Sequence, residues 1–148
     1  MNEELRKDVE DLKGQLIEWR RDFHRHPEIA FHEQRTSAVI RDFLEKLEIK
    51  VTACAETGLK GVIEGKPGGR TVALRADMDA LPLKEEGEKE YLSENPEATH
   101  ACAHDGHMAV LMGVAKILSQ RKSWFKGKVV FLFQPAEELP PGGAKRMV

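Results

Sequence analysis

Stretches with helical periodicity alternate along this chain with short apolar runs typical of β-strands. Apolar side chains recur at helical spacing over residues 8–24 and 33–47, and again after Asp105. The expected strands cover residues 50–53, 59–64, 71–76 and 128–133. This order of elements predicts an α/β fold in which a mixed, largely buried sheet is flanked by helices.

Local breaks separate these elements. Pro27 is expected to end the first helix, because the residue before a proline avoids the helical region. The glycine-rich run at 66–69 predicts a turn between two strands, and residues 84–99 are expected to form the longest loop. At 148 residues, the chain fits one domain with a core of its own.

Charge and hydropathy exclude several classes of partner. The net charge is −2 with both signs interleaved, so nothing points to nucleic acid. No apolar run approaches the roughly 18 residues that span a bilayer, and no apolar leader follows Met1, so a cytoplasmic protein without membrane contact is expected. Cys54 and Cys102 leave a disulfide open, although Cys102 lies among histidines, where a thiolate can serve as a metal ligand.

Residues 100–107 hold the densest group of potential metal ligands in the chain. The residues able to ligate a metal are His100, Cys102, His104, Asp105 and His107. Imidazole, thiolate and carboxylate groups together suit zinc and neighbouring divalent metals. Such a metal activates water as a nucleophile near neutral pH, so this cluster predicts a metal site with hydrolytic chemistry.

Two further polar clusters follow predicted strands. Asp77 and Asp79 come after the third strand, and Glu137 and Glu138 come shortly after the last one. Sites in open α/β sheets form outside the carboxyl ends of the strands. Both clusters can therefore converge with residues 100–107 in one crevice.

Each cluster also has a plainer interpretation. The two aspartates suit turn or helix-cap positions, and adjacent glutamates are commonly solvated surface. His24 and His26 fit the end of a surface helix better than a site. Packing explains Cys102 and His104 poorly, because two further histidines and an aspartate lie so close to them.

The spacing indicates a division of labour. Cys102 and His104 lie two residues apart, so both side chains can point to one centre, which Glu138 can complete. The neighbouring Glu137 can then take a proton from water near the metal and pass it to a leaving amine. Asp79 can hold a ligand imidazole in the correct tautomer.

Together these motifs resemble the aminoacylase-type metallopeptidases of the M20 superfamily, specifically their amidohydrolase branch. That branch includes hippurate hydrolases, N-acyl-amino-acid amidohydrolases and thermostable carboxypeptidases. The matching stretches are residues 20–28, 75–82, 100–107 and 133–138, followed by a glycine-rich turn at 142–145. Order and spacing both match from about Trp19 to the last residue.

The resemblance implies two divalent ions per complete site, drawn from zinc, manganese, cobalt or nickel. Carried over residue by residue, Cys102, His104 and Glu138 are the expected metal ligands and Glu137 the general base. Asp77, Asp79 and His107 are expected to support them. The implied reaction is hydrolysis of the amide bond in N-acyl amino acids or small peptides.

Two departures from the family pattern matter. The family usually has glycine where this chain has Ala103, so alanine strains the loop if that position needs a positive φ. Family members also continue further, and the resemblance places two more histidine ligands and a lid or dimerisation domain outside residues 1–148. These residues are therefore expected to form a partial, truncated catalytic domain.

Two main hypotheses remain for function. Residues 1–148 are either the N-terminal part of such an amidohydrolase or a metal-binding or interaction module without turnover. A weaker third hypothesis is a redox or regulatory thiol protein that uses Cys102. An open sheet edge and exposed apolar surface are expected, so the chain should self-associate, dissolve poorly or bind a complementary C-terminal fragment.

Overall fold

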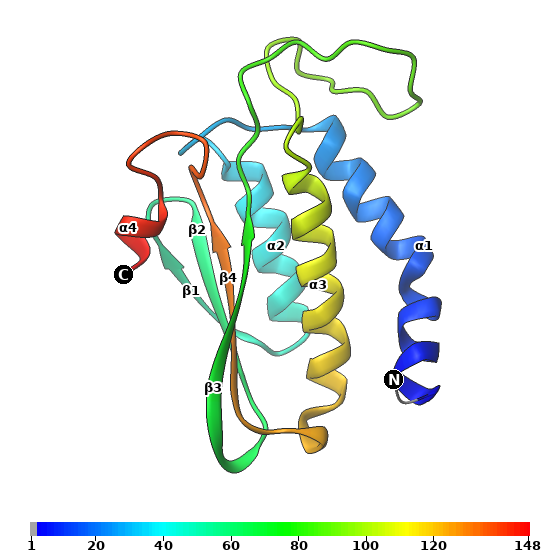
Figure 1. Ribbon diagram of the computed structural model, residues 1–148, viewed down its shortest axis with the longest axis vertical. Helices are drawn as coiled ribbons and strands as arrows, with labels where there is room; N and C mark the ends of the chain where they lie inside the picture. The colour runs from blue at the N-terminus through cyan, green and yellow to red at the C-terminus, as the bar shows by residue number, and fades with distance from the viewer. Residues whose placement is uncertain (1–2) are drawn as a thin grey trace.

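The computed structural model describes residues 3–148, in which three long helices lie beside one sheet (Figure 1). The helices are α1 (Glu3–Arg25), α2 (Gln34–Lys46) and α3 (His104–Gln120). The strands are β1 (Lys50–Cys54), β2 (Gly58–Glu64), β3 (Lys66–Asp77) and β4 (Lys126–Gln134). The remaining elements are a 3-10 turn, η1 (Lys122–Trp124), and a short helix, α4 (Ala144–Met147).

The sheet is mixed, with the strand order β1-β2-β4-β3. Strand β2 pairs antiparallel with both β1 and β4, whereas β3 runs parallel to β4. A parallel pair needs a crossover connection, and here a long loop and α3 provide it. The predicted α/β fold with a mixed sheet flanked by helices is confirmed.

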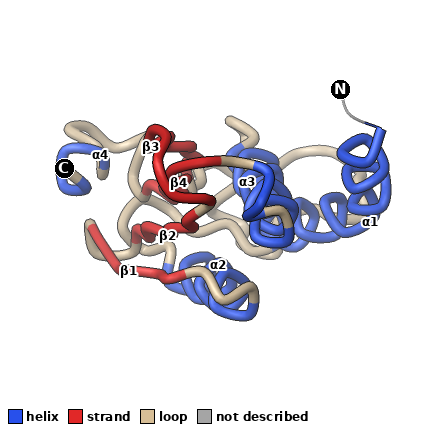
Figure 2. The backbone as a smooth tube through the Cα atoms, turned by 90° about the horizontal axis from the view of Figure 1, so that it is seen from below, coloured by secondary structure: helices blue, strands red, loops and turns tan. Residues whose placement is uncertain are grey.

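The core lies between the sheet and one layer of helices. Helices α2 and α3 pack against the sheet, and α1 packs against α3 from outside (Figure 2). The aromatic rings of Phe131 and Phe133 on β4 are fully buried, as are Met108 and Met112 on the inner face of α3. Burial of each such side chain stabilises the fold by about 1.5–3 kcal/mol.

Most predicted boundaries agree with the structure. Helix α1 ends just before His26 and Pro27, as proline chemistry requires. The turn predicted at 66–69 is wrong, because β3 already begins at Lys66, which pairs with Lys126. The pairing register shifts between Lys66 and Thr71, and the positive φ angles of the glycines between them accommodate this bulge within the strand.

Strand β3 forms one edge of the described sheet. Within residues 3–148 it pairs only with β4, so its other side offers unpaired backbone groups. Apolar side chains are exposed nearby, with Val72 of β3 52% exposed and Val110 of α3 61% exposed. The open edge and exposed apolar surface expected from the sequence are therefore present.

Within residues 3–148, no helix combines the length and apolar character needed to cross a membrane.

Candidate metal centre

The three polar clusters meet where β3 and β4 end and α3 begins. These element ends lie beneath the long loop in the upper part of Figure 1. Asp77 is the last residue of β3, and His104 is the first residue of α3. Glu137 and Glu138 follow β4 after a two-residue link. Because β3 and β4 are parallel, their carboxyl ends bring these residues together, as the strand order requires.

His104 is the centre of the arrangement. Its buried ring places Nδ1 2.8 Å from the backbone oxygen of Asp79, so this nitrogen donates a hydrogen bond. Nε2 faces acidic groups, 3.6 Å from Asp77 Oδ1 and 3.7 Å from Glu138 Oε1. A ring held at Nδ1 with Nε2 turned toward carboxylates is the usual arrangement of a metal-ligating histidine.

The charges around His104 favour a cation at this point. Burial alone would lower the pKa of the imidazole, but the hydrogen bond to Asp79 and the charge of Asp77 raise it to about 9. The carboxylates therefore stabilise positive charge near Nε2, which a proton or a metal ion can supply.

Asp79 connects this ring to the glutamate pair. Its side chain is 1% exposed, and Oδ1 and Oδ2 each accept a 2.9 Å hydrogen bond, from the backbone N–H of Glu137 and Glu138 respectively. Burial would raise the pKa of Asp79, but the bonds from His104 and from both backbone N–H groups lower it overall. Asp79 thus holds the loop after β4 against the start of α3.

Replacement of Asp79 by alanine is expected to lower the free energy of unfolding by about 2–5 kcal/mol. The change leaves two partly buried backbone N–H groups without their carboxylate acceptor, at about 1–3 kcal/mol each. Urea unfolding followed by circular dichroism measures the loss. Asp42→Ala, on the exposed side of α2, is the control and should stay within about 0.5 kcal/mol of the parent.

Asp77 and His107 form a second contact beside His104. His107 Nδ1 lies 2.6 Å from Asp77 Oδ1, and the His107 ring stacks on that of His104 with centroids 5.6 Å apart. Arg75 Nη2 lies 3.3 Å from the other Asp77 oxygen. Burial raises the pKa of Asp77, yet the hydrogen bond from His107 and the charge of His104 lower it overall. Asp77 is therefore an anion that His107 and Arg75 hold in place.

Two groups of potential ligand atoms lie within 4.8 Å of one another, one of Asp77, His104 and His107 and one of His104, Glu137 and Glu138. Among residues 3–148, Cys102 is in neither group. Its thiol is free and exposed, and the nearby carboxylate of Glu138 raises the pKa of Cys102. Converging imidazole and carboxylate groups, with a thiol on the adjoining loop, fit a divalent transition metal.

The backbone between Cys102 and His104 is strained. Ala103 has φ 61° and ψ 27°, in the left-handed region that costs an alanine about 1–2 kcal/mol. The strain expected from alanine at a glycine position is therefore present. It turns the chain sharply, so that His104 can start α3 while Cys102 stays on the preceding loop.

Ala103→Gly is expected to raise the free energy of unfolding by about 0.5–1 kcal/mol, because glycine adopts this φ without a steric penalty. Equilibrium unfolding in urea tests this. The matched control is Ala101→Gly, two residues earlier, where φ is not positive and glycine should stabilise nothing. An equal effect of both substitutions would contradict the strain.

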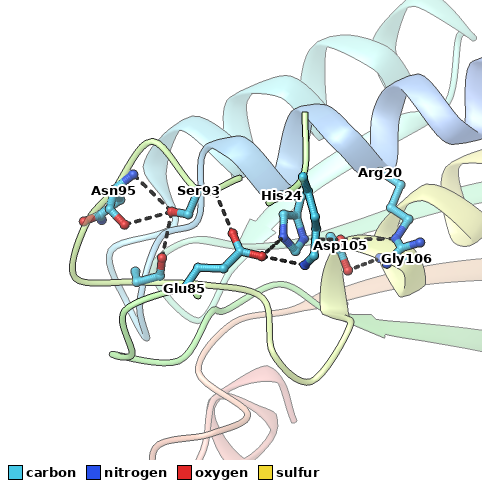
Figure 3. A network of polar contacts seen from close by, with 9 residues as sticks. Arg20, His24, Glu85, Ser93, Asn95, Asp105 and Gly106 are labelled. Carbon is cyan, nitrogen blue, oxygen red and sulfur yellow. Dashed lines mark hydrogen bonds and ion pairs between the residues drawn. The ribbon is translucent and has the colours of Figure 1, made fainter. Parts of the chain in front are cut away.

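His24 is not the surface residue that the sequence predicted. Its ring is buried, with Nδ1 2.8 Å from Asp105 Oδ2 and Nε2 2.8 Å from Glu85 Oε1 (Figure 3). Arg20 Nε reaches the same oxygen of Asp105 at 3.3 Å. The local sequence gives no sign of this, because the two partners of His24 lie 81 and 61 residues away.

The His24 contacts join the long loop to the first turn of α3. Glu85 Oε2 accepts a 2.7 Å bond from the backbone N–H of Ser93, and its other oxygen lies 2.7 Å from Lys89 Nζ. Burial raises the pKa of Glu85, but the hydrogen bonds from Lys89 and His24 lower it to about 2. The loop predicted at 84–99 is confirmed, and this carboxylate fixes it beside the residues that carry His104.

Comparison with known proteins identifies the family that the chain matches. Residues 73–148 match the family model "Peptidase family M20/M25/M40". An N-acyl-L-amino acid amidohydrolase of Geobacillus stearothermophilus is 45% identical over 99% of this chain, and thermostable carboxypeptidase 2 of Saccharolobus solfataricus is 42% identical over 99% of it. The chain spans 40% and 38% of the lengths of these two relatives.

A solved structure gives the same result. A Bacillus subtilis protein, described as a dinuclear metal-binding peptidase from the M20 family, superimposes with a TM-score of 0.86 and 40% identity. The match covers 92% of this chain and 39% of that one. The chain therefore belongs to the M20 peptidase family.

Proposed function

We propose that residues 1–148 are the N-terminal part of the catalytic domain of a metal-dependent amidohydrolase. The proposed reaction is hydrolysis of the amide bond in N-acyl amino acids or small peptides. The observation that carries the proposal is the convergence of ligand atoms of His104, Glu137 and Glu138 within 4.8 Å of one another. The names of the relatives, an amidohydrolase and a carboxypeptidase, support the substrate class.

Each side chain has a distinct role in this proposal. Cys102, His104 and Glu138 hold a divalent metal, and the dinuclear relative supports a complete site of two ions, with zinc, manganese, cobalt or nickel as the candidates. When bound, the metal lowers the pKa of water and polarises the amide carbonyl. The side chain of Glu137 is exposed and faces the same centre, so it takes the proton from water and delivers it to the leaving nitrogen.

The supporting residues keep these groups in place. Asp79 fixes the ring of His104 and the backbone of both glutamates. Asp77 and His107, which are in contact with each other, lie beside the ring of His104. These two residues also line a cleft of about 740 Å³ along α3 and β3, bounded by Arg20 and Arg75.

The surface beside the cleft suggests the partners. The chain spans about two fifths of its relatives, and β3 is unpaired on one side within the described residues. We infer that this edge and the exposed apolar residues of α3 bind a complementary C-terminal segment or a second copy of the chain. Such a partner brings the further ligands that a centre of two ions needs.

Metal analysis combined with an amidase assay tests the function. The purified chain is loaded with Zn²⁺, Mn²⁺, Co²⁺ or Ni²⁺, its metal content is measured, and hydrolysis of N-acetyl amino acids and hippurate is followed. Bound metal with turnover supports the amidohydrolase. Bound metal without turnover, alone and with a complementary C-terminal segment, favours the metal-binding module. Absence of bound metal together with reversible oxidation of Cys102 favours the thiol protein.

A further inference from the structure

Glu33 is a buried carboxylic acid that the proposed reaction does not use. Glu33 is 0% exposed, and burial raises the pKa of its carboxyl group above the ordinary value. Oε2 accepts a 2.6 Å hydrogen bond from Thr57 Oγ1, and Oε1 accepts a 2.9 Å bond from the backbone N–H of Ala136. A carboxyl group is costly to bury, so a role for these contacts is expected.

The contact with Ala136 lies directly before the proposed base and ligand. Ala136 has φ 49°, a left-handed conformation that a neighbouring contact must maintain, and its oxygen accepts a 3.0 Å bond from the Gly143 N–H. The next two backbone N–H groups, of Glu137 and Glu138, bond to Asp79. The backbone N–H groups of three successive residues are thus held by the buried carboxyl groups of Glu33 and Asp79.

Helix capping does not explain Glu33. Although it immediately precedes α2, its side chain makes no capping hydrogen bond to that helix. Glu28 does so instead, accepting bonds from the backbone N–H groups of Arg35 and Thr36 at 3.0 and 2.8 Å. The carboxyl group of Glu33 is directed to the loop after β4, which is 103 residues away in sequence.

We propose that Glu33 is a positioning residue for the metal centre, acting through the backbone of Ala136 to fix the direction of Glu137 and Glu138. This inference rests on the proposed function for the identity of those two groups. Thr57 in turn fixes the carboxyl group of Glu33. Outer partners of this kind typically change metal affinity by about 10- to 100-fold when removed.

The test compares Glu33→Met, Glu33→Gln and the control Glu28→Met. Methionine removes the acceptor for the Ala136 N–H, whereas glutamine keeps one carbonyl oxygen and should rescue. Glu28→Met removes a carboxylate that also binds backbone N–H groups but only at α2. Hydrogen exchange of the Glu137 and Glu138 amides is measured by NMR on the metal-free chain, and Co²⁺ affinity and the visible Co²⁺ spectrum are measured by titration.

Glu33→Met is expected to speed exchange of both amides at least about 10-fold, to weaken Co²⁺ binding about 10- to 100-fold and to shift the spectrum. Glu33→Gln and Glu28→Met should leave all three close to the parent. If Glu33→Met does not fold, the same measurements are made on Thr57→Val, which removes the hydroxyl group that bonds to Glu33. Unchanged exchange in the folded variant overturns the inference. A parent chain that binds no Co²⁺ overturns the proposed function instead, and the exchange data still decide the role of Glu33.

Discussion

Replacement of His104 by alanine is expected to weaken binding of Zn²⁺ or Co²⁺ by more than about 100-fold, because loss of a direct ligand should exceed the effect of losing an outer partner. His104 belongs to both groups of potential ligand atoms, so no alternative arrangement of the described residues replaces it. Competitive titration with a chromophoric chelator measures the affinity. Circular dichroism of the metal-free variant checks that α3, which starts at this residue, still forms.

Two further histidines sharpen this result. His32→Ala changes an exposed residue just before α2 and should leave the affinity for the metal unchanged. If His107 only supports Asp77, His107→Ala should reduce the metal affinity several-fold. If the group of Asp77, His104 and His107 holds the ion, His107→Ala should reduce the affinity as strongly as His104→Ala. A parent-like affinity in His104→Ala would contradict the assignment of the centre.

Glu137→Gln is expected to lower the hydrolysis rate by about 100- to 10,000-fold while metal affinity stays within a few-fold of the parent. Glutamine has nearly the same shape but cannot accept the proton. The backbone N–H of residue 137 still bonds to Asp79, so the loop should keep its conformation. The assay is hydrolysis of N-acetyl amino acids by the metal-loaded protein, with metal content measured on the same samples.

Glu138→Gln is the matched comparison, because the two glutamates are neighbours whose backbones bond to the two oxygens of one aspartate. It should lose metal and activity together, whereas Glu137→Gln should lose activity alone. Full turnover by Glu137→Gln would remove Glu137 from the reaction. The opposite pattern would exchange the roles of the two residues.

The helices and strands were predictable because their signals are local. Periodic apolar positions located α2 and α3, and Pro27 located the end of α1. The start of β3 was not predictable in the same way. A run of glycines normally indicates a turn, and only pairing of Lys66 with Lys126, across the crossover, makes that segment part of the strand.

The candidate site was predictable only in part, for the same reason. Asp77, Asp79, His104 and the two glutamates stand at strand ends and helix starts, which chain order reveals, and the structure brings them together. Their chemical roles stay predictions. The local sequence does not reveal the buried contacts of His24 and Glu33, because their partners lie from 24 to 103 residues away. The energetic contribution of a buried ionisable group depends on such partners.

The crossover from β3 to β4 also affects how the molecule acquires its site. The hydrogen bonds that assemble the centre join residues 25, 58 and 59 positions apart, so they form only after the loop and α3 have closed over the sheet. Contacts of such high order form late, because chain entropy must be lost before they contribute energy. We therefore expect the proposed centre to take up metal in the final stage of folding, because a chain that has not closed its crossover offers the ion only isolated, weak ligands.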